Sequence, residues 1–190
     1  VSKLQPLDRV VALADAGQRS FGENYPQDLR DRAAALADRG LDWHAIGPLQ
    51  RNKVKYVARA ASWFHALDRL EVAVELGSRR VNDPIRCFVE VNVAGEATKH
   101  GVAPAEVGRL CDAVRAVPGI ALVGLMGMPP IPDDPGWTME ASRVHFRALA
   151  ALARSLGLSE LSMGTTGDFP VAVEEGATWV RVGRLLFGDR

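Results

Sequence analysis

Residues 160–183, ELSMGTTGDFPVAVEEGATWVRVG, contain two short apolar runs that each end at a glycine. The first run ends at Gly164 and the second at Gly183. Between them, residues 168–175 have the pattern of a short helix that begins beside an aspartate and a proline. A strand, a helix and a second strand in this order predict a βαβ unit, whose two strands lie parallel.

The same alternation of short apolar runs and longer helical patterns extends over the whole chain, with Gly, Pro or Asn at the joins. Such a chain is expected to form a parallel sheet covered by helices. The expected strands are 19–21, 42–46, 63–67, 86–93, 121–126, 160–163 and 179–182, and residues 1–2 are expected to be the tail of an earlier strand. The expected helices are one that opens at 6–8 and those at 26–38, 49–59, 69–77, 104–116, 138–156 and 168–175.

Eight strands with this regularity favour a closed (β/α)8 TIM barrel over an open doubly wound α/β sheet. The glycine pattern GxGxxG, which a dinucleotide-binding sheet carries after its first strand, is missing from the sequence. No linker or repeat of another kind divides the sequence, so we expect residues 1–190 to form one barrel domain.

The composition limits the classes of partner. Lysine plus arginine and aspartate plus glutamate both number 23, so the formal net charge is zero and no general attraction to nucleic acid or an anionic membrane is expected. The sequence has no apolar run of the roughly 20 residues that span a bilayer. Cys87 and Cys111 lie in apolar segments, and we expect them to be reduced core residues of a cytoplasmic protein. The four histidines lack metal-ligand spacing, so no metal site is predicted.

In a (β/α)8 barrel, the chemistry takes place at the carboxyl ends of the strands. The loops after the last two strands commonly hold a phosphate there, because their backbone N–H groups can bind an anion. Two interpretations of Gly164 and Gly183 are open: a phosphate site, or glycine turns that serve only the tight connections. The polar residues that follow the glycines are Thr165, Thr166 and Arg184.

Lys3 is the other candidate at a strand end. A lysine that faces the mouth of a barrel can form a Schiff base with a carbonyl compound once its amine is desolvated. A lone lysine near the start of a chain is, however, ordinarily a solvated surface residue, so the residue by itself leaves both interpretations open.

Several motifs in order along the chain carry a family resemblance. They are VSK at 1–3, GQRSFGENYPQDL at 17–29, WHAIGPLQRNK at 43–53, EVNVAGEATKHGV at 90–102, GLMGM at 124–128 and LSMGTTGDFPVAVEEGATWVRVGRLLFGDR at 161–190. Together they resemble the YggS/PROSC family of pyridoxal 5′-phosphate (PLP) homeostasis proteins, whose barrel is related to the N-terminal domain of alanine racemase. The motifs span nearly the whole chain.

The resemblance implies an alanine-racemase N-terminal-domain-like barrel, here lacking the N-terminal helix and part of strand 1. It implies PLP as the cofactor, bound as an internal aldimine on Lys3, with its phosphate between the two glycine turns. An arginine in the place of Arg181 faces the pyridine nitrogen in racemase-like barrels, and Asn24 is expected to make a polar contact near the ring. The full set of expected cofactor-binding residues is Lys3, Asn24, Met126, Ser162, Gly164, Thr165, Thr166, Arg181, Gly183 and Arg184.

Two departures from the family pattern affect the phosphate site. The family usually reads LSMGMSDD, and Thr166 keeps the hydroxyl of its serine. The family usually has a threonine after its VRIG motif, where this chain has Arg184. That arginine either folds inward and binds the phosphate or points to solvent.

Function is predicted from the expected site. A fixed positive charge at Arg181 opposes protonation of the pyridine nitrogen and weakens PLP as an electron sink. The chain has only two tyrosines, Tyr25 and Tyr56, both expected on helix surfaces and neither placed like the catalytic second-domain tyrosine of alanine racemase. We therefore expect a monomeric, non-catalytic PLP-binding protein of PLP homeostasis, with PLP-dependent apo-enzymes as partners. The alternatives are a PLP-dependent racemase or decarboxylase and a metal-free Schiff-base aldolase.

The remaining polar candidates are expected to be structural. His44 and His65 lie within strand patterns and are expected to be packed and hydrogen-bonded in the interior, whereas His100 and His145 are expected to be exposed. The charged candidates are a basic cluster of Arg51, Lys53 and Lys55, which is either a solvated face or a landing surface for an acidic partner or free PLP, and an ion pair between Glu96 and Lys99.

Overall fold

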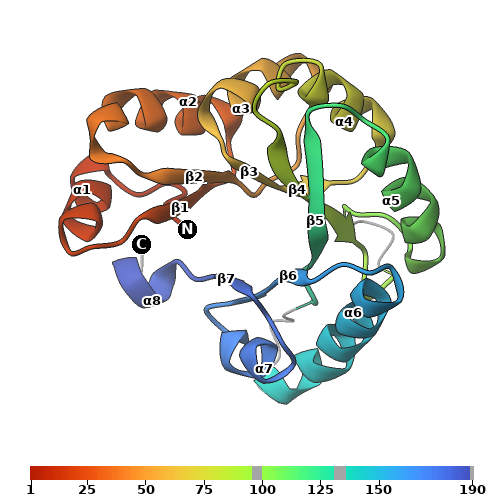
Figure 1. The fold of residues 1–190 in the computed structure, drawn as a ribbon. Helices are drawn as coiled ribbons and strands as arrows, with labels where there is room; N and C mark the ends of the chain where they lie inside the picture. The colour runs from red at the N-terminus through yellow and green to blue at the C-terminus, as the bar shows by residue number, and fades with distance from the viewer. Residues whose placement is uncertain (96–99, 131–135, 189–190) are drawn as a thin grey trace.

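The computed structural model describes residues 1–95, 100–130 and 136–188 of the chain. Within these residues, parallel strands follow one another around a nearly closed barrel in their chain order, and helices cover its outside (Figure 1). Each strand pairs with the next one along the chain, as expected when every connection contains a helix. The strands are β1 Ser20–Glu23, β2 Asp42–Ala45, β3 Trp63–Leu67, β4 Ile85–Val91, β5 Ile120–Gly127, β6 Glu160–Thr165 and β7 Trp179–Arg181.

The helices form the outer layer of the barrel. Several begin with a short 3₁₀ turn: η2 Arg51–Lys53, η3 Pro104–Glu106 and η4 Met139–Ser142 precede α-helices, and η1 Ala37–Arg39 follows one. The α-helices are α1 Leu7–Asp15, α2 Pro26–Ala35, α3 Val54–Ala60, α4 Leu70–Gly77, α5 Val107–Arg115, α6 Arg143–Ser155, α7 Phe169–Glu174 and α8 Arg184–Phe187.

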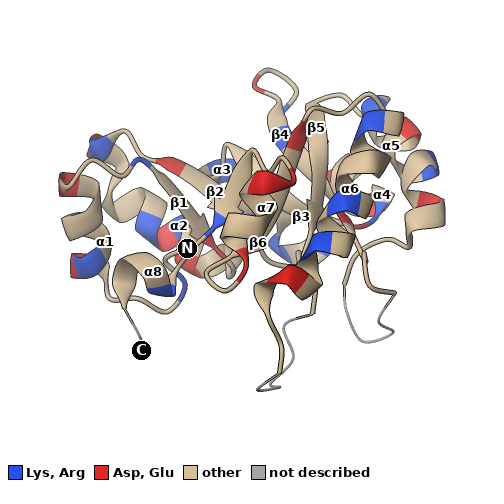
Figure 2. Cartoon of the chain, turned by 90° about the horizontal axis from the view of Figure 1, so that it is seen from below, with Lys and Arg blue, Asp and Glu red and all other residues tan. Residues whose placement is uncertain are grey.

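The burial pattern explains why the chain alternates in this way. All five residues of β3 are buried, as expected for a strand that has the barrel interior on one face and helices on the other. In α6 the buried residues are Phe146, Leu149, Ala150 and Ala153, which recur at helical spacing and form one apolar stripe. The opposite faces of the helices carry interspersed acidic and basic residues (Figure 2).

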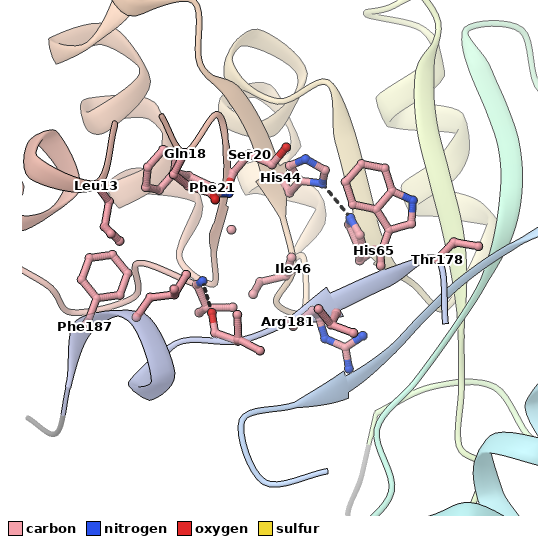
Figure 3. Close-up of a pocket in the computed structure, with 16 residues that line it drawn as sticks. Leu13, Gln18, Ser20, Phe21, His44, Ile46, His65, Thr178, Arg181 and Phe187 are labelled. Carbon is pink, nitrogen blue, oxygen red and sulfur yellow. Dashed lines mark hydrogen bonds between the residues drawn. The ribbon is translucent and has the colours of Figure 1, made fainter. Parts of the chain in front are cut away.

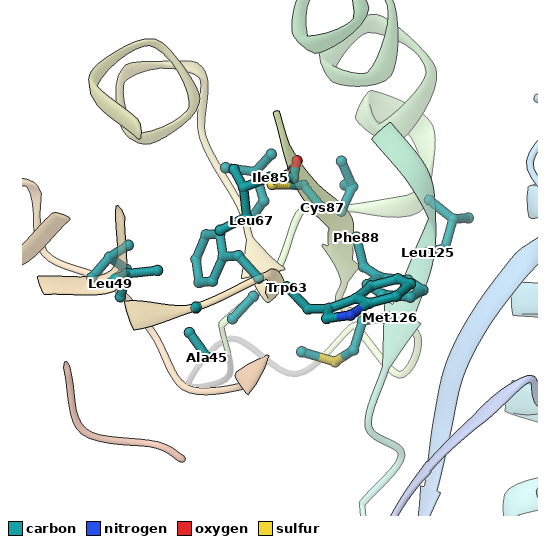
Figure 4. Close-up of a cluster of buried hydrophobic side chains, with 14 of the residues drawn as sticks. Ala45, Leu49, Trp63, Leu67, Ile85, Cys87, Phe88, Leu125 and Met126 are labelled. Carbon is teal, nitrogen blue, oxygen red and sulfur yellow. Dashed lines mark hydrogen bonds between the residues drawn. The ribbon is translucent and has the colours of Figure 1, made fainter. Parts of the chain in front are cut away.

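The barrel interior is filled by large side chains rather than left as a pore. Trp63 stacks on Phe88 with ring centroids 6.0 Å apart, and Met126 lies beside them with 3% of its surface exposed (Figure 4). Trp179 of β7 contacts Trp63 from across the barrel, with ring centroids 4.6 Å apart. This packed interior leaves the strand ends and the loops after them as the places for a ligand.

Residues 1 and 2 lie in the gap between β1 and β7 (Figure 1). The Ser2 N–H donates to the carbonyl of Gly22 at 3.0 Å, and the Val1 amino group donates to the carbonyl of Val182 at 2.5 Å. The two residues therefore occupy the position of the eighth strand and link the two edges of the sheet. This places Lys3 directly beyond that position, at the carboxyl end of the barrel.

The expected barrel fold is confirmed, with differences at particular elements. Within the described residues the sheet has seven strands, and residues 1–2 fill the eighth position without forming a strand of their own. The first expected strand was placed at 19–21, whereas β1 is Ser20–Glu23 and ends with a buried glutamate. Helix α8 begins directly after Gly183 and was not expected from the residue pattern.

Cys87 and Cys111 are buried and free, as expected. Across the described parts of the chain, no helix is both long and apolar enough to cross a membrane.

Candidate functional site

Lys3 lies in a tight turn at the mouth of the barrel. The turn spans residues 2–5 and is closed by a hydrogen bond of 3.0 Å from the Gln5 N–H to the carbonyl of Ser2. Leu4 has φ of 60°, and in the described part of the chain it is the one non-glycine residue with positive φ. The turn is therefore strained locally and depends on surrounding contacts to persist.

Tyr25, expected on a helix surface, lies beside Lys3 at the start of α2. It is the residue before α2, and the Lys3 Nζ atom is 5.4 Å from the centroid of its ring. Tyr25 is 45% exposed, and its ring faces the lysine at cation–π distance. A phenol therefore stands next to the expected PLP-binding amine.

The two glycine turns meet in the structure. The Gly183 N–H donates to Thr166 Oγ1 at 3.2 Å, which joins the loop after β6 to the turn after β7. A Cβ atom on Gly183 would lie 3.2 Å from the carbonyl oxygen of Val1, two residues before Lys3. Hydroxyl and amide donors able to bind an anion are thus gathered beside the Lys3 turn.

The two threonines of this loop have different partners. The N–H and the hydroxyl of Thr165 donate to Asp168 Oδ1 at 2.7 and 3.0 Å. The other oxygen of this buried carboxylate accepts from the Ser142 hydroxyl at 3.0 Å. Asp168 therefore fixes the shape of the loop and accepts hydrogen bonds from both donors of Thr165. Thr166 is the threonine that faces the second turn.

Packing alone requires a glycine at position 164, independently of any ligand. Its φ is 90°, and a Cβ atom at this position would lie 2.6 Å from Ala172 Cβ of α7 and 3.0 Å from the Phe169 backbone. Only glycine lets α7 approach the end of β6 this closely. The glycine itself therefore supports the tight-turn interpretation, while the donors around it support a phosphate site.

Arg181 extends from β7 into the barrel and is held at two points. Its Nη1 donates to Ser162 Oγ at 2.7 Å and its Nη2 donates to the carbonyl of Gly127 at 3.1 Å. Burial lowers the pKa of Arg181 to about 10, while the charges of Glu90 and Asp168 oppose this shift. The guanidinium still carries its positive charge at neutral pH.

A chain of buried hydrogen bonds continues from Ser162 across the barrel. His65 Nδ1 lies 2.8 Å from Ser162 Oγ, and His65 Nε2 lies 3.0 Å from His44 Nδ1 (Figure 3). At the far end His44 Nε2 faces Asp42 Oδ2 at 3.5 Å. His44 and His65 are thus packed and hydrogen-bonded in the interior, as predicted.

The groups at the two ends of this hydrogen-bond chain fix which atoms donate and which accept along it. A guanidinium can only donate, so Ser162 accepts from Arg181 and directs its own proton to His65. His65 Nε2–H then donates to His44 Nδ1, and His44 Nε2–H points at the Asp42 carboxylate. Both imidazoles are neutral in this arrangement, in agreement with burial, which lowers the pKa of His44 to about 4 and that of His65 well below its ordinary value.

The depressed histidine pKa values predict an acid-dependent loss of stability. A group that protonates near pH 6.5 when unfolded but near pH 4 when folded destabilises the fold as the pH falls through this window. Between pH 7 and pH 5, His44 should cost about 2 kcal/mol of unfolding free energy. Glu23 and Glu90, whose pKa values are raised by burial, act in the opposite direction. Urea unfolding of the protein and of His44→Gln at both pH values isolates the histidine: equal losses in the two proteins would contradict the prediction.

The other expected site residues lie nearby with differing exposure. Asn24 is half-buried just beyond β1, with its backbone packed against Gly47. Met126 is buried on β5, opposite Ser162 in the register of β5 and β6. Arg184 is exposed at the first position of α8, directly after Gly183.

A cavity of about 360 Å³ opens between β1 and β7, and its lining runs from Gln18 and Thr178 at the amino ends of these strands to Val1 and Val182 (Figure 3). Its wall includes Arg181, His44 and His65 with apolar residues such as Phe21 and Phe187. His44, His65 and Arg181 of the buried hydrogen-bond chain thus form one side of an open cavity that lies along the two edge strands.

Two buried acidic groups near the site were not predicted from the sequence. Glu23 ends β1 with 1% of its surface exposed, and Glu90 on β4 is 8% exposed. Glu23 lay outside the expected strand 19–21, and Glu90 lay inside the expected strand 86–93 but was not considered as a site residue. Only Glu90 carried a signal in the sequence, as a charged residue inside a run that must be buried on both faces.

The remaining candidates are largely structural. His100 is exposed as expected, but His145 is half-buried with Nδ1 3.3 Å from the carbonyl of Val93, so the expectation for His145 was wrong. Within the described residues no group of acidic, histidine or cysteine side chains could hold a metal ion. Glu96 and Lys99, expected to pair, lie outside the described residues. In the basic cluster, Arg51 lies 3.7 Å from Glu75, while Lys53 and Lys55 flank the Tyr56 ring at 5.8 and 5.2 Å.

Comparison with known proteins places this geometry in context. Residues 6–190 match the sequence model of the family described as alanine racemase, N-terminal domain. An alanine racemase structure from Clostridium difficile, 13% identical, superposes with a TM-score of 0.75 over 100% of this chain and 51% of that chain, which shows the shared fold. The fold and the site thus define the class: a (β/α)8 barrel of the alanine racemase N-terminal type.

Closer relatives narrow the class to one family. The chain is 42% identical to the pyridoxal phosphate homeostasis protein of Pseudomonas aeruginosa and 37% identical to that of Escherichia coli, over 100% of this chain and 83% and 84% of theirs. The structure of PipY from Synechococcus elongatus with PLP bound is 31% identical, with a TM-score of 0.87 over 98% of this chain and 90% of that chain. This chain belongs to the pyridoxal phosphate homeostasis protein family.

Proposed function

We propose that this protein binds PLP and acts in PLP homeostasis without catalysing a reaction of its own. The observation that carries the proposal is the meeting of three groups at one end of the barrel: the Lys3 turn, the Thr166–Gly183 contact and the Arg181 guanidinium. PLP has three corresponding features, namely an aldehyde, a phosphate and a pyridine nitrogen. The PLP-bound structure of PipY and the names of the relatives support the same assignment.

The residues present fit the cofactor. The Thr166 hydroxyl and the Gly183 N–H bind each other here, and both are donors that can turn to a phosphate. Arg184 follows them with a permanent charge and can fold toward the same anion. The Lys3 amine can attack the aldehyde carbon with loss of one water, which leaves a Schiff base between protein and PLP. Arg181 keeps its proton, and its positive charge would face the pyridine nitrogen of bound PLP.

With this arginine in place, carbanion chemistry on PLP would depend on well-placed acid and base groups. PLP stabilises carbanions by drawing electrons into its ring, and a fixed positive charge at the pyridine nitrogen disfavours the protonation that makes it effective. The relatives are named as homeostasis proteins rather than as enzymes. Tyr25 is the observation that keeps a racemase or decarboxylase as the second candidate, because its phenol lies beside the Lys3 amine. We further propose PLP-dependent apo-enzymes in the cytoplasm as recipients of the bound cofactor.

The absorption spectrum and an activity assay together test this function. The purified protein, loaded with PLP and freed of excess, should absorb near the visible edge, and borohydride should fix PLP to the peptide that contains Lys3. Incubation of the loaded protein with single amino acids should leave their chirality and amount unchanged. A colourless protein after loading would overturn the binding role, whereas steady racemisation or decarboxylation would favour the enzyme.

Thr166→Val is expected to weaken PLP binding by about ten-fold or more, because a hydrogen bond to a charged phosphate contributes roughly 1.5–3 kcal/mol. The substitution removes the hydroxyl at nearly constant volume. Equilibrium dialysis with PLP measures the loss. Thr178→Val is the matched control, because the Thr178 hydroxyl bonds to Leu161 at the other end of the strands. Equal affinity in the two variants would show that the phosphate does not contact Thr166.

A further inference from the structure

The turn that presents Lys3 is held by a buried ion pair. Glu23 Oε1 accepts a hydrogen bond of 2.6 Å from the Ser2 hydroxyl and lies 3.3 Å from Arg32 Nε. Arg32 Nη2 donates to the carbonyl of Gln5 at 2.5 Å. Arg32 thus contacts Gln5, the last residue of the turn, directly, and it contacts Ser2, the first residue of the turn, through Glu23. The ion pair therefore bonds to both ends of the segment that contains Lys3.

This pair is costly for the fold. The Glu23 side chain is fully buried and that of Arg32 is 14% exposed. Within residues 1–95, 100–130 and 136–188, Glu23 Oε2 and Arg32 Nη1 have no hydrogen-bond partner. A buried ion pair that leaves polar atoms unsatisfied is a poor source of stability, and apolar residues of similar volume commonly serve a core as well or better.

The position of the pair indicates what it does instead. Leu4 holds a left-handed backbone conformation that leucine adopts only when neighbouring contacts impose it. The Ser2–Glu23 and Gln5–Arg32 contacts lie on the two sides of Lys3 and Leu4, so they define the direction in which the lysine leaves the backbone. An apolar pair at the same place would pack but would not fix the two ends of the turn by directional bonds.

We propose that Glu23 and Arg32 are positioning residues that hold the Lys3 turn in the conformation from which its amine reaches the aldehyde of PLP. The proposal rests on the function proposed above, because it assigns a purpose to the geometry of that lysine. Neither residue touches the cofactor: they act through Ser2, Gln5 and the backbone of the turn. Misplacement of a reacting group by about 1 Å can reduce a rate by as much as a hundred-fold, so a loosened turn should slow covalent attachment more than it weakens noncovalent binding.

The test separates attachment from binding. Arg32→Met keeps the aliphatic stem and removes both contacts, and Arg30→Met is the control, because Arg30 lies on the same helix but pairs with Asp31 at the surface. The rate of covalent attachment is measured by stopped-flow absorbance after mixing with PLP. Noncovalent binding is measured with pyridoxine 5′-phosphate, which carries the phosphate and the ring but no aldehyde.

In Arg32→Met we expect attachment to slow by about ten-fold or more, while affinity for pyridoxine 5′-phosphate changes less than two-fold. Arg30→Met should match the parent in both measurements, and Arg32→Lys, which can keep one contact, should recover part of the rate. An unchanged attachment rate, or equal losses in rate and affinity, would overturn the proposal. If Arg32→Met does not fold, Ser2→Ala decides: it removes one hydroxyl, and a parent-like rate would overturn the proposal. A parent that never attaches PLP would instead refute the proposed function.

Discussion

Lys3→Ala is expected to lose covalent PLP binding entirely. A Schiff base requires a primary amine, and Lys3 is the amine that the fold places beyond residues 1 and 2, beside the meeting point of the two glycine turns. The loaded variant should lack the absorbance of the protein-bound imine and should show only the spectrum of free aldehyde or hydrate. Mass spectrometry after borohydride reduction should find no PLP adduct, whereas the parent should carry one.

Lys55→Ala is the control for this substitution. Lys55 is an exposed lysine of α3 that packs against the Tyr56 ring and lies outside the proposed site. Its replacement should leave the spectrum and the adduct unchanged. Undiminished colour in Lys3→Ala would contradict the assignment, and an adduct found at another lysine would identify the residue that replaces it.

Gly124→Ala is expected to be the most destabilising single-methyl change in the barrel sheet. A Cβ atom at this position would lie 1.9 Å from the carbonyl oxygen of Glu160 and 2.6 Å from its carbonyl carbon. These are backbone atoms of the paired strand, so neither can move without separating β5 from β6. We expect a loss of at least about 3–4 kcal/mol, as for severe overpacking, measured by urea unfolding.

Separation of β5 from β6 would also disturb the site, because β5 supplies the Gly127 carbonyl that holds Arg181 and β6 supplies Ser162.

Gly108→Ala is the control for Gly124→Ala. It also adds one methyl group to a glycine, but it is expected to stabilise the protein. Gly108 lies in α5, where an added Cβ would meet only Leu156 Cδ2 at 3.6 Å, and helical glycine to alanine should stabilise by up to about 1 kcal/mol. Equal stability of the two variants would contradict the close approach of β5 and β6.

Much of the fold was readable from the sequence, because the hydrophobic pattern reports burial locally. The buried run of β3 and the apolar stripe of α6 are visible in the order of residues alone. The same reasoning failed where burial and polarity conflict. The first strand was placed at 19–21 and missed the buried Glu23 at its end, and Tyr25 was assigned to a helix surface, although the end of β1 brings it to Lys3.

The order of residues by itself determined the alternating strands and helices, and with them the end of the barrel at which Lys3, Thr166 and Arg181 lie. Only the tertiary structure decided which of these groups touch each other. His65 and Ser162 are 97 residues apart, and Ser2 meets Glu23 across 21 residues. Such partners are selected by barrel closure and register, which depend on the packing of all the strands together. A hydrogen bond between distant residues leaves no periodic pattern in the sequence. The donors and acceptors of the buried hydrogen-bond chain, and the contacts of Glu23 and Arg32 with the Lys3 turn, therefore became visible only in three dimensions.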